Sequence, residues 1–354
     1  VGGVWESWAC HMGHGGHARS MAQVDGFTAG RYDPAAWADV SARSGAGYAG
    51  LTSKHHDGVA WWDTGAGDLD VVERTPAGRD LVAPYVEALR SRGLKVGLYY
   101  SLIDWTHEDY PGFLRDTPRY RADPVRWARF CDFNLAQIRE LSSRFSPDLV
   151  WFDGDWEHTA EEWRAEEIRH LLLQDNPDVV INSRLRGHGD YATPEQGLPI
   201  VPPKERYWEL CMTMNDSWGW QPDDDNYKTP NQVIRILVDC LSNGGNLLLD
   251  VGPRGDGTIP GEQVAILEHL GRWVGKHAEA VHGTRRGIAP GHHVGPTALS
   301  PDRTVLYLYL PYRPTGPVAV TGPVSGLEGV RVVGHAIRLD WDVKMTQSWR
   351  AEPG

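Results

Sequence analysis

Short apolar segments alternate with longer segments of helical periodicity over most of the chain. The short segments predict strands because Gly, Pro and polar residues bound them, and the long ones predict helices because their apolar residues recur three and four positions apart. We expect strands at 48–52, 95–100, 149–152, 179–182, 206–209 and 246–251. We expect helices at 34–45, 80–92, 124–145, 161–174, 231–242 and 262–280. This alternation predicts a parallel sheet with crossover helices.

Polar residues follow four successive predicted strands. They are Lys54-His55-His56-Asp57, Tyr99-Tyr100-Ser101, Asp153 and Asn182-Ser183-Arg184. Barrels of the (β/α)8 type build their active sites at the carboxyl ends of all their strands, whereas a doubly wound sheet gathers its function at one switch point. The pattern therefore predicts an α/β fold with a (β/α)8-like barrel.

The pattern changes near residue 287. Apolar or alternating segments at 305–310, 318–321, 329–333 and 336–341 lie between Gly and Pro turns, which predicts a small all-β domain. Residues 282–296 have the composition of a linker. We therefore expect a catalytic barrel over residues 1–285 and a C-terminal β domain over residues 286–354.

Charge and composition exclude some partners. A net charge of −12 over 354 residues argues against nucleic acid or an anionic membrane as a partner. No apolar run approaches the length of a membrane-spanning helix. The 16 Trp and 13 Tyr against 6 Phe suit the binding of sugar rings. The cysteines form no CxxC pair, so we expect them to be free and buried: Cys10, Cys131, Cys211 and Cys240. Oligomeric state and compartment are left open.

Asp153 is the strongest catalytic candidate. It directly follows the buried strand Leu149-Val150-Trp151-Phe152, and Gly154 lets the backbone turn away from it. An ionised carboxylate is costly to bury, so its place at a strand end points to use in a cleft. We interpret Asp153 as a nucleophile or a general base.

Two further groups of residues have the chemistry of a sugar site. His55 and His56 can donate to and accept from hydroxyl groups, and both enter one site only if the strand ends there. Surface histidines or a metal site are the alternatives, although no third ligand at a known spacing accompanies them.

If Asp153 is one of the two carboxylates of a glycosidase, the chain must supply a second one. The candidates are Glu195, Glu209, Asp190, Glu157 and Glu6, and composition does not separate Glu195 from Glu209.

An ordered series of motifs over residues 27–286 resembles the α-L-fucosidases of glycoside hydrolase family 29. The motifs are KHHDG, WWDT, GLYYS, LVWFDGDW, GDYATPE, WELCMTMNDSWGW and NGGNLLLDVGPRGDGTIP. The resemblance implies a (β/α)8-like barrel followed by a β-sandwich, no metal or other cofactor, and hydrolysis with retention of anomeric configuration. Its implied partner is a fucosylated oligosaccharide or glycoconjugate.

The resemblance also implies roles for individual residues. Asp153 matches the family's nucleophile, and Glu195 matches its acid/base residue, in preference to Glu209. The implied sugar-binding residues are His55, His56, Tyr99, Trp151, Arg184 and Trp218. The family's first strand carries an FxHWG segment that has no counterpart here, so we expect that strand to be missing from the chain or to be replaced by an unusual N-terminus. Glu6 matches a GEW segment loosely and is a further sugar-binding candidate.

The sequence therefore predicts a retaining α-L-fucosidase. A barrel glycosidase of different sugar specificity and a non-catalytic fucose-binding homologue are the alternatives, and transfer to another sugar is a third outcome. The preferred linkage is open, because aglycone contacts come from loops such as residues 13–26 and 221–229.

Overall fold

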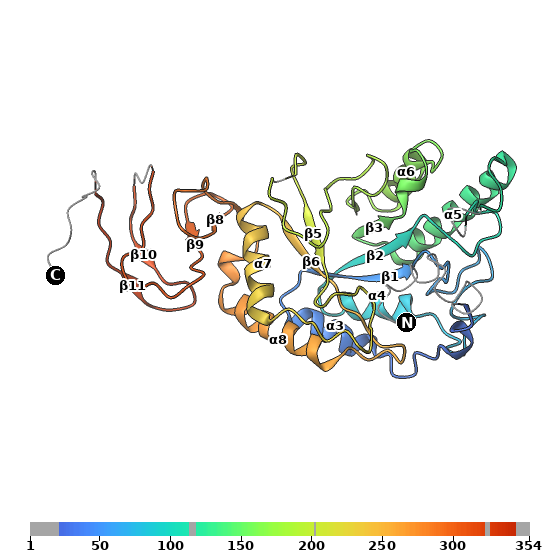
Figure 1. The fold of residues 1–354 in the computed structure, drawn as a ribbon, viewed down its shortest axis with the longest axis horizontal. Coiled ribbons are helices and arrows are strands. Elements are labelled where there is room, and N and C mark those ends of the chain that lie inside the picture. The colour runs from blue at the N-terminus through green and yellow to red at the C-terminus, as the bar shows by residue number, and fades with distance from the viewer. Residues whose placement is uncertain (1–20, 113–117, 202, 323–325, 345–354) are drawn as a thin grey trace.

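The computed structural model describes residues 21–112, 118–201, 203–322 and 326–344. Figure 1 shows a body of helices and parallel strands, with a group of short C-terminal strands at one end of the long axis. Helices and strands alternate through the body, so the α/β class predicted from the sequence is confirmed.

Four parallel strands form the main sheet in chain order. They are β1 (Tyr48–Lys54), β2 (Lys95–Ser101), β3 (Leu149–Asp153) and β4 (Val180–Ile181). Parallel neighbours need crossover connections, because a tight hairpin reverses the chain direction. The helices are α3 (Pro34–Arg43) before β1 and then α4 (Val82–Arg90), α5 (Pro124–Phe145) and α6 (Ala165–Asp175) between the strands. All four strands therefore end at the same edge of the sheet.

Single bridged residues continue this parallel pairing into a second sheet. The bridges join Asn182 with Tyr191, Ala192 with Trp208, and Glu195 with Cys211. The second sheet consists of β5 (Glu209–Met212) and β6 (Asn246–Leu249), with α7 (Pro230–Ser242) between them and α8 (Gly261–Lys276) after them. The strand predicted at 206–209 thus lies three residues later, because burial begins at Trp208 whereas Tyr207 is exposed.

The free edges of the two sheets, β1 and β6, approach each other at their first residues. Asn246 Nδ2 donates a hydrogen bond of 2.8 Å to the Tyr48 hydroxyl. In the described part of the chain, no strand pairing joins β6 to β1. Closure of the barrel and the missing first strand therefore remain predictions.

Helices α5 and α7 begin at the same local signal, a capping residue followed by proline. The Asp123 side chain accepts from the backbone N–H groups of Val125 and Arg126, and Pro124 occupies the first turn, where it costs no helical hydrogen bond. Thr229 and Gln232 form a reciprocal capping box at the start of α7, again with a proline behind the cap. These local signals explain why the predicted start of each helix lies within one residue of the observed start.

Strands β2 and β3 bury both of their faces, and successive side chains along them have different roles. Tyr100 on β2 faces outward, where its hydroxyl contacts Asn134 and Gln137 of α5. Tyr99 beside it faces inward and reaches Asp153. The alternation along a strand therefore directs every second side chain toward the interior of the sheet's curve.

Among the described residues after 284, the regular elements are all strands, and these strands are short. β7 (Arg285–Arg286), β8 (Thr297–Leu299) and β9 (Leu306–Leu308) form one antiparallel sheet, and β10 (Val330–Arg331) with β11 (Arg338–Leu339) forms another. The strand predicted at 318–321 is wrong, because these residues form no strand. The linker predicted at 282–296 is also wrong in part, since β7 lies inside it and pairs with β8 through backbone bonds that composition does not reveal.

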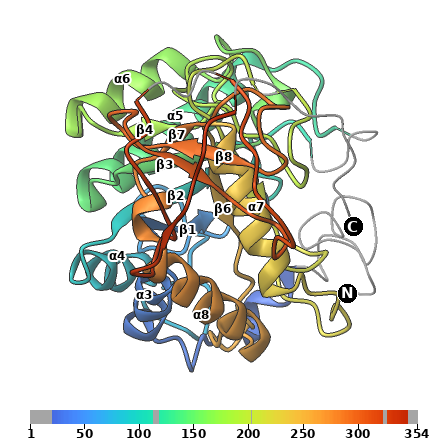
Figure 2. The same cartoon turned by 90° about the vertical axis from the view of Figure 1, so that its left-hand side faces the viewer.

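Salt bridges and hydrogen bonds attach the C-terminal strands to the end of the body. Arg331 donates to Glu279 through both terminal nitrogens, and Lys276 Nζ lies 2.9 Å from His335 Nε2. Viewed along the long axis in Figure 2, the C-terminal strands lie in front of the strands of the body, and α3, α4, α6, α7 and α8 lie around them. No helix among the described residues is long and apolar enough to cross a membrane.

The cysteines agree with the expectation as far as they are described. Cys131, Cys211 and Cys240 are free and buried. Cys10 lies outside the described residues.

Candidate active site

Asp153 lies at the carboxyl end of β3 with three partners around its carboxylate. The Tyr99 hydroxyl donates to Oδ2 at 2.8 Å, and Arg184 Nη1 donates to Oδ1 at 2.8 Å. His56 Nε2 is 3.7 Å from Oδ2. Gly154 has φ +80°, and a Cβ there would collide with Ile103, so this turn requires glycine. The predicted role of Gly154, to turn the backbone away from the carboxylate, fits this geometry.

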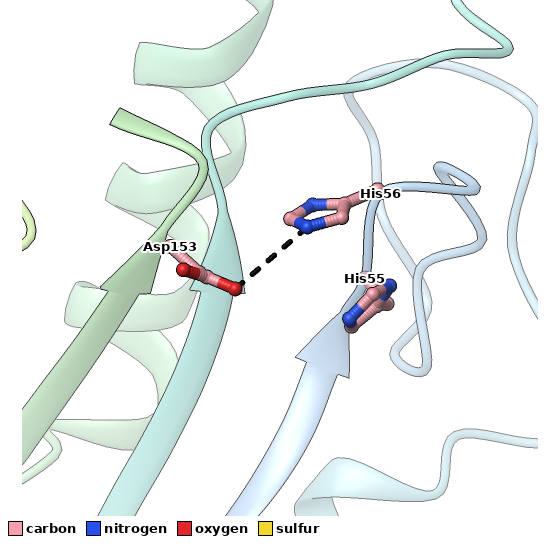
Figure 3. Close-up of side chains that lie close together, drawn as sticks. All are labelled: His55, His56 and Asp153. Carbon is pink, nitrogen blue, oxygen red and sulfur yellow. Dashed lines mark ion pairs between the residues drawn. The ribbon is translucent and has the colours of Figure 1, made fainter. Parts of the chain in front are cut away.

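The two adjacent histidines enter the same site because β1 ends at Lys54. Their rings lie 4.2 Å apart, and the His55 ring stacks on Tyr99 at 5.5 Å. Figure 3 shows both rings extending from the end of β1, with His56 directed at Asp153. The strand contains a register shift between Thr52 and Lys54, which alters how the following residues face the sheet.

Ser101 at the end of β2 fixes the tautomer of His56. The Ser101 hydroxyl donates its only proton to the Ile103 carbonyl at 2.7 Å, so it accepts from His56 Nδ1 at 2.6 Å. Nδ1 of His56 therefore carries a proton, and Nε2 is the nitrogen that faces Asp153. Ser101 is part of the strand-end motif Tyr99-Tyr100-Ser101, but this role was not predicted from the sequence.

Arg184 joins the two predicted catalytic carboxylates. Its Nη1 donates to Asp153, and its Nη2 donates to Glu195 Oε2 at 2.5 Å. Its guanidinium also lies over the Trp151 ring, 4.4 Å from the ring centre. Burial alone would lower the pKa of Arg184, but the two carboxylates outweigh burial and raise it. The structure therefore brings Asp153 and Glu195 to one guanidinium.

Glu195 reaches this place through the bridge to β5. It pairs with Cys211, and the Cys211 N–H donates to the Pro194 carbonyl at 3.0 Å. The Glu195 side chain is 40% exposed, which contrasts with the buried Asp153. The carboxylate is therefore fixed through its backbone while remaining open to solvent.

Glu209, the alternative second carboxylate, lies at the other end of the strands. It is the first residue of β5, so it precedes Cys211 by about 7 Å along the strand. Tyr48 donates to Glu209 Oε2, and Asn246 Nδ2 donates to the same oxygen at 2.9 Å. Burial raises its pKa to about 7, against the opposing hydrogen bond from Asn246. The hydrogen bonds from Tyr48 and Asn246 hold Glu209 away from the carboxyl ends of the strands, where Asp153 lies.

The remaining predicted sugar-binding residues surround the same interior. Trp151 stacks on Tyr99 with ring centres 5.5 Å apart, and its buried Nε1 has no hydrogen-bond partner in the described structure. Trp218 is partly buried against the cluster formed by Trp151 and Cys211. Desolvation, with Asp153 nearby, raises the pKa of Tyr99 well above its usual value, so Tyr99 stays a donor. Glu6 lies outside the described residues.

Asp153, His55 and His56 also have the composition of a metal site. Their ligand atoms lie within 4.8 Å of one another. However, Arg184 donates to the same carboxylate, and a bound cation would be repelled by this guanidinium. Donors, acceptors and stacked rings around one carboxylate match a neutral polyhydroxylated ligand better than a cation.

Trp156 is a site residue that the sequence reasoning did not single out. It lies in the short 3-10 helix η2 (Asp155–Glu157) directly after Asp153, and its ring meets His56 edge-on at 5.8 Å. It is 36% exposed at the rim of the site. Its place within the acidic-aromatic run after Asp153 is the signal that could have identified it.

Comparisons with known proteins show which family the chain is similar to. A family model described as Alpha-L-fucosidase matches residues 13–279. The alpha-L-fucosidase of Branchiostoma floridae is 33% identical over 89% of this chain and 72% of that protein. The human plasma alpha-L-fucosidase is 31% identical over 89% of this chain and 70% of that protein.

Solved structures give the same result. Alpha-L-fucosidase isoenzyme 1 from Paenibacillus thiaminolyticus has a TM-score of 0.85 at 32% identity, over 93% of this chain and 83% of that one. A trapped covalent intermediate of a GH29 alpha-L-fucosidase from Bacteroides thetaiotaomicron, in complex with 2-fluoro-fucosyl fluoride, has a TM-score of 0.83 at 26% identity. That match covers 94% of this chain and 80% of the other.

Proposed function

The chain belongs to the α-L-fucosidase family of glycoside hydrolases, and from this premise we propose that it hydrolyses terminal α-L-fucose from glycans with retention of configuration. One observation carries the proposal: a single guanidinium, Arg184, donates to both Asp153 and Glu195. Retaining glycosidases hold their two carboxyl groups about 5–5.5 Å apart, and inverting ones hold them wider by several ångströms. A shared guanidinium favours the shorter spacing.

In the first step Asp153 attacks the anomeric carbon of fucose. The bond to the leaving oxygen breaks while Glu195 gives that oxygen its proton, and a covalent β-fucosyl-enzyme forms. In the second step Glu195 takes a proton from water, whose oxygen attacks the anomeric carbon and releases Asp153. Tyr99 and Arg184 support this cycle because both donate to the Asp153 carboxylate and so stabilise its charge when it leaves.

The sugar would be held by groups that surround Asp153. His55, His56 and Arg184 can exchange hydrogen bonds with several hydroxyl groups, and a site built in this way rejects sugars that lack them. Trp151 offers its unpaired indole N–H, and Trp218 would pack on the apolar face of the pyranose or on its methyl group.

We also infer that the strands of the body close into a (β/α)8-like barrel over residues 1–285, followed by a β-sandwich domain over 286–354. The hydrogen bond between Asn246 and Tyr48 supports closure, since it joins the edge strands β6 and β1. The two antiparallel sheets that β7 to β11 form support a separate β domain.

The proposal is tested by measuring fucose release from a panel of α1-2, α1-3/4 and α1-6 fucosylated oligosaccharides, with the anomer followed by NMR. We expect the α anomer of fucose to appear first, because two inversions give net retention. A β anomer as the first product would contradict retention. Faster turnover of another nitrophenyl glycoside than of nitrophenyl α-L-fucoside would contradict the assigned sugar specificity. Binding of fucose without turnover would contradict the assigned activity.

A further inference from the structure

Lys54 is a fully buried charged residue that the proposed reaction does not use. None of its surface is exposed, and its ammonium group lies over the Tyr100 ring, 4.3 Å from the ring centre. Tyr100 faces α5, so Lys54 lies on the outer side of the sheet. Lys54 therefore has its own environment, separate from the sugar-binding interior.

The partners of the Lys54 ammonium group are few and specific. Nζ lies 3.5 Å from Asp104 Oδ2 and 3.4 Å from Asn134 Oδ1. Asp104 is itself only 2% exposed. Desolvating two such charges costs several kcal/mol for each ion, and a well-packed apolar pair is often as stable or more stable. Packing alone therefore does not account for a lysine at this position.

Asp104 connects the loops that follow β1 and β2. Its Oδ1 accepts from the backbone N–H groups of Thr106 and His107 at 3.0 and 2.9 Å. Gly58, with φ +89°, packs directly on this carboxylate, and a side chain at residue 58 would collide with it. The ion pair thus fixes both loops relative to the end of β1.

These two loops hold the His56 backbone and ring. The Trp105 N–H, next to Asp104, donates to the His56 carbonyl at 2.8 Å. Ser101 holds the His56 ring, and the register shift that ends β1 lies directly before Lys54. The position of His56 opposite Asp153 therefore depends on groups that Lys54 and Asp104 hold together.

We infer that Lys54 is a positioning residue for the sugar site, which acts through Asp104 to hold His55 and His56 toward Asp153. The inference rests on the proposed function, because it assigns these histidines to fucose. Lys54 itself contacts no substrate. Its charge aligns the loop so that the two imidazoles meet the sugar in one geometry.

The first test compares Lys54→Met with Lys95→Met. Met has a similar length without the charge, and Lys95 is a control on β2 whose side chain is largely exposed although it pairs with Asp148. We expect kcat/KM for 4-nitrophenyl α-L-fucoside to fall at least about tenfold for Lys54→Met, because small misplacements cost up to about 100-fold. The control should stay within about twofold. Calorimetric binding of L-fucose should weaken in parallel with kcat/KM.

A double-mutant cycle tests the route through Asp104. Asp104→Asn keeps an oxygen that can accept from Thr106 and His107 but removes the charge. If Lys54 acts through Asp104, the double variant Lys54→Met with Asp104→Asn should be no less active than the worse single variant. Additive losses would overturn the route. If Lys54→Met does not fold, the single variant Asp104→Asn tests the inference. An unchanged kcat/KM of the Asp104→Asn variant would overturn the inference.

The pH profile is a readout that a purely structural role would not move. Burial lowers the pKa of Lys54 to about 8, although Asp104 and then Asp57 oppose this shift. His107, on the loop after β2, also faces this group of charges. With a good leaving group, which needs no proton, wild-type kcat/KM should decline above about pH 8. Lys54→Arg should show no such decline relative to its own activity at pH 7, because arginine stays protonated.

Failures of the two proposals are distinguishable. If the wild type binds L-fucose but does not hydrolyse fucosides, the proposed function is overturned. The inference about Lys54 is then tested by binding alone, and weaker binding of L-fucose by Lys54→Met supports it. A wild type that hydrolyses fucosides while folded Lys54→Met stays within twofold of it overturns only the inference.

Discussion

The two ends of the parallel strands each hold a buried carboxyl group, and the two groups have opposite partners. Asp153, at the carboxyl end of β3, receives hydrogen bonds from Arg184 and Tyr99. Glu209, at the amino end of β5, receives them from neutral groups, Tyr48 and Asn246. A cation stabilises a charged carboxylate, whereas burial raises the pKa of Glu209 and the hydrogen bond from Asn246 opposes this only in part. Both groups are buried, so the cation that contacts Asp153 is what distinguishes the surroundings of the two carboxyl groups.

The largest expected effect is the loss of Asp153. Asp153→Gly should lower kcat on the order of 10⁴-fold or more, since it removes the nucleophile. Added azide should restore turnover and give β-fucosyl azide, detected by NMR. If a Glu157→Gly or Asp155→Gly variant forms this azide and Asp153→Gly does not, the nucleophile is that neighbouring acidic residue instead of Asp153.

Replacement of Glu195 should give the next effect. Glu195→Ala should lower kcat for natural linkages by about 10²–10⁴-fold, because the leaving oxygen then receives no proton. Nitrophenyl fucosides should still show the first step as a burst in stopped-flow measurements. Glu209→Ala is the competing variant, and an unchanged rate for Glu195→Ala on natural linkages would move the acid/base role away from Glu195.

Arg184 is the group that makes the two ends differ. Arg184→Lys keeps the charge but loses the fork that reaches both carboxylates. We expect kcat/KM to fall by about 10–100-fold, or 1.4–2.7 kcal/mol in transition-state stabilisation. The control Arg169→Lys changes an outer pair with Asp190 and should have little effect. Equal losses in both variants would show that the fork of Arg184 has no special role.

The smallest effect on activity, and a distinct effect on stability, is expected for Glu209→Gln. Its pKa is about 7 in the folded protein, above the usual 4.5, so the acid's contribution to stability is complete below about pH 4.5 and is lost as the pH rises through 7. Glutamine does not ionise. The free energy of unfolding of the variant relative to wild type should therefore rise by up to about 3 kcal/mol between pH 5 and pH 8.

Urea unfolding at several pH values measures this difference. Glu279→Gln is the control, because Glu279 forms an exposed pair with Arg331 and its pKa is lowered mainly by that hydrogen bond. The control should change by less than about 1 kcal/mol. A Glu209 variant whose relative stability does not depend on pH would contradict the neutral environment that we assign to this end of the strands.

Some of the site was predictable because it depends on local order. Strand ends with polar residues can be recognised from the chain, and the motif Asp153-Gly154 contains both the carboxylate and the turn that exposes it. Asp123-Pro124 marks the start of α5 for the same reason. Short edge strands were missed: β7 has two exposed arginines, so only its pairing with β8 makes it a strand.

The sequence by itself determined the α/β class, most helix and strand positions, and, through its family resemblance, which carboxyl groups to suspect. Periodicity and capping are local properties, so they can be recognised without the fold. Only the tertiary structure decided that Glu195 lies on the Arg184 guanidinium while Glu209 lies near Tyr48, and that Lys54 is paired with Asp104. Tyr48 and Glu209, like Lys54 and Asp104, are far apart in the chain, and Arg184 and Glu195 come from successive segments after β4. Each of these contacts depends on how the strands curve and pair.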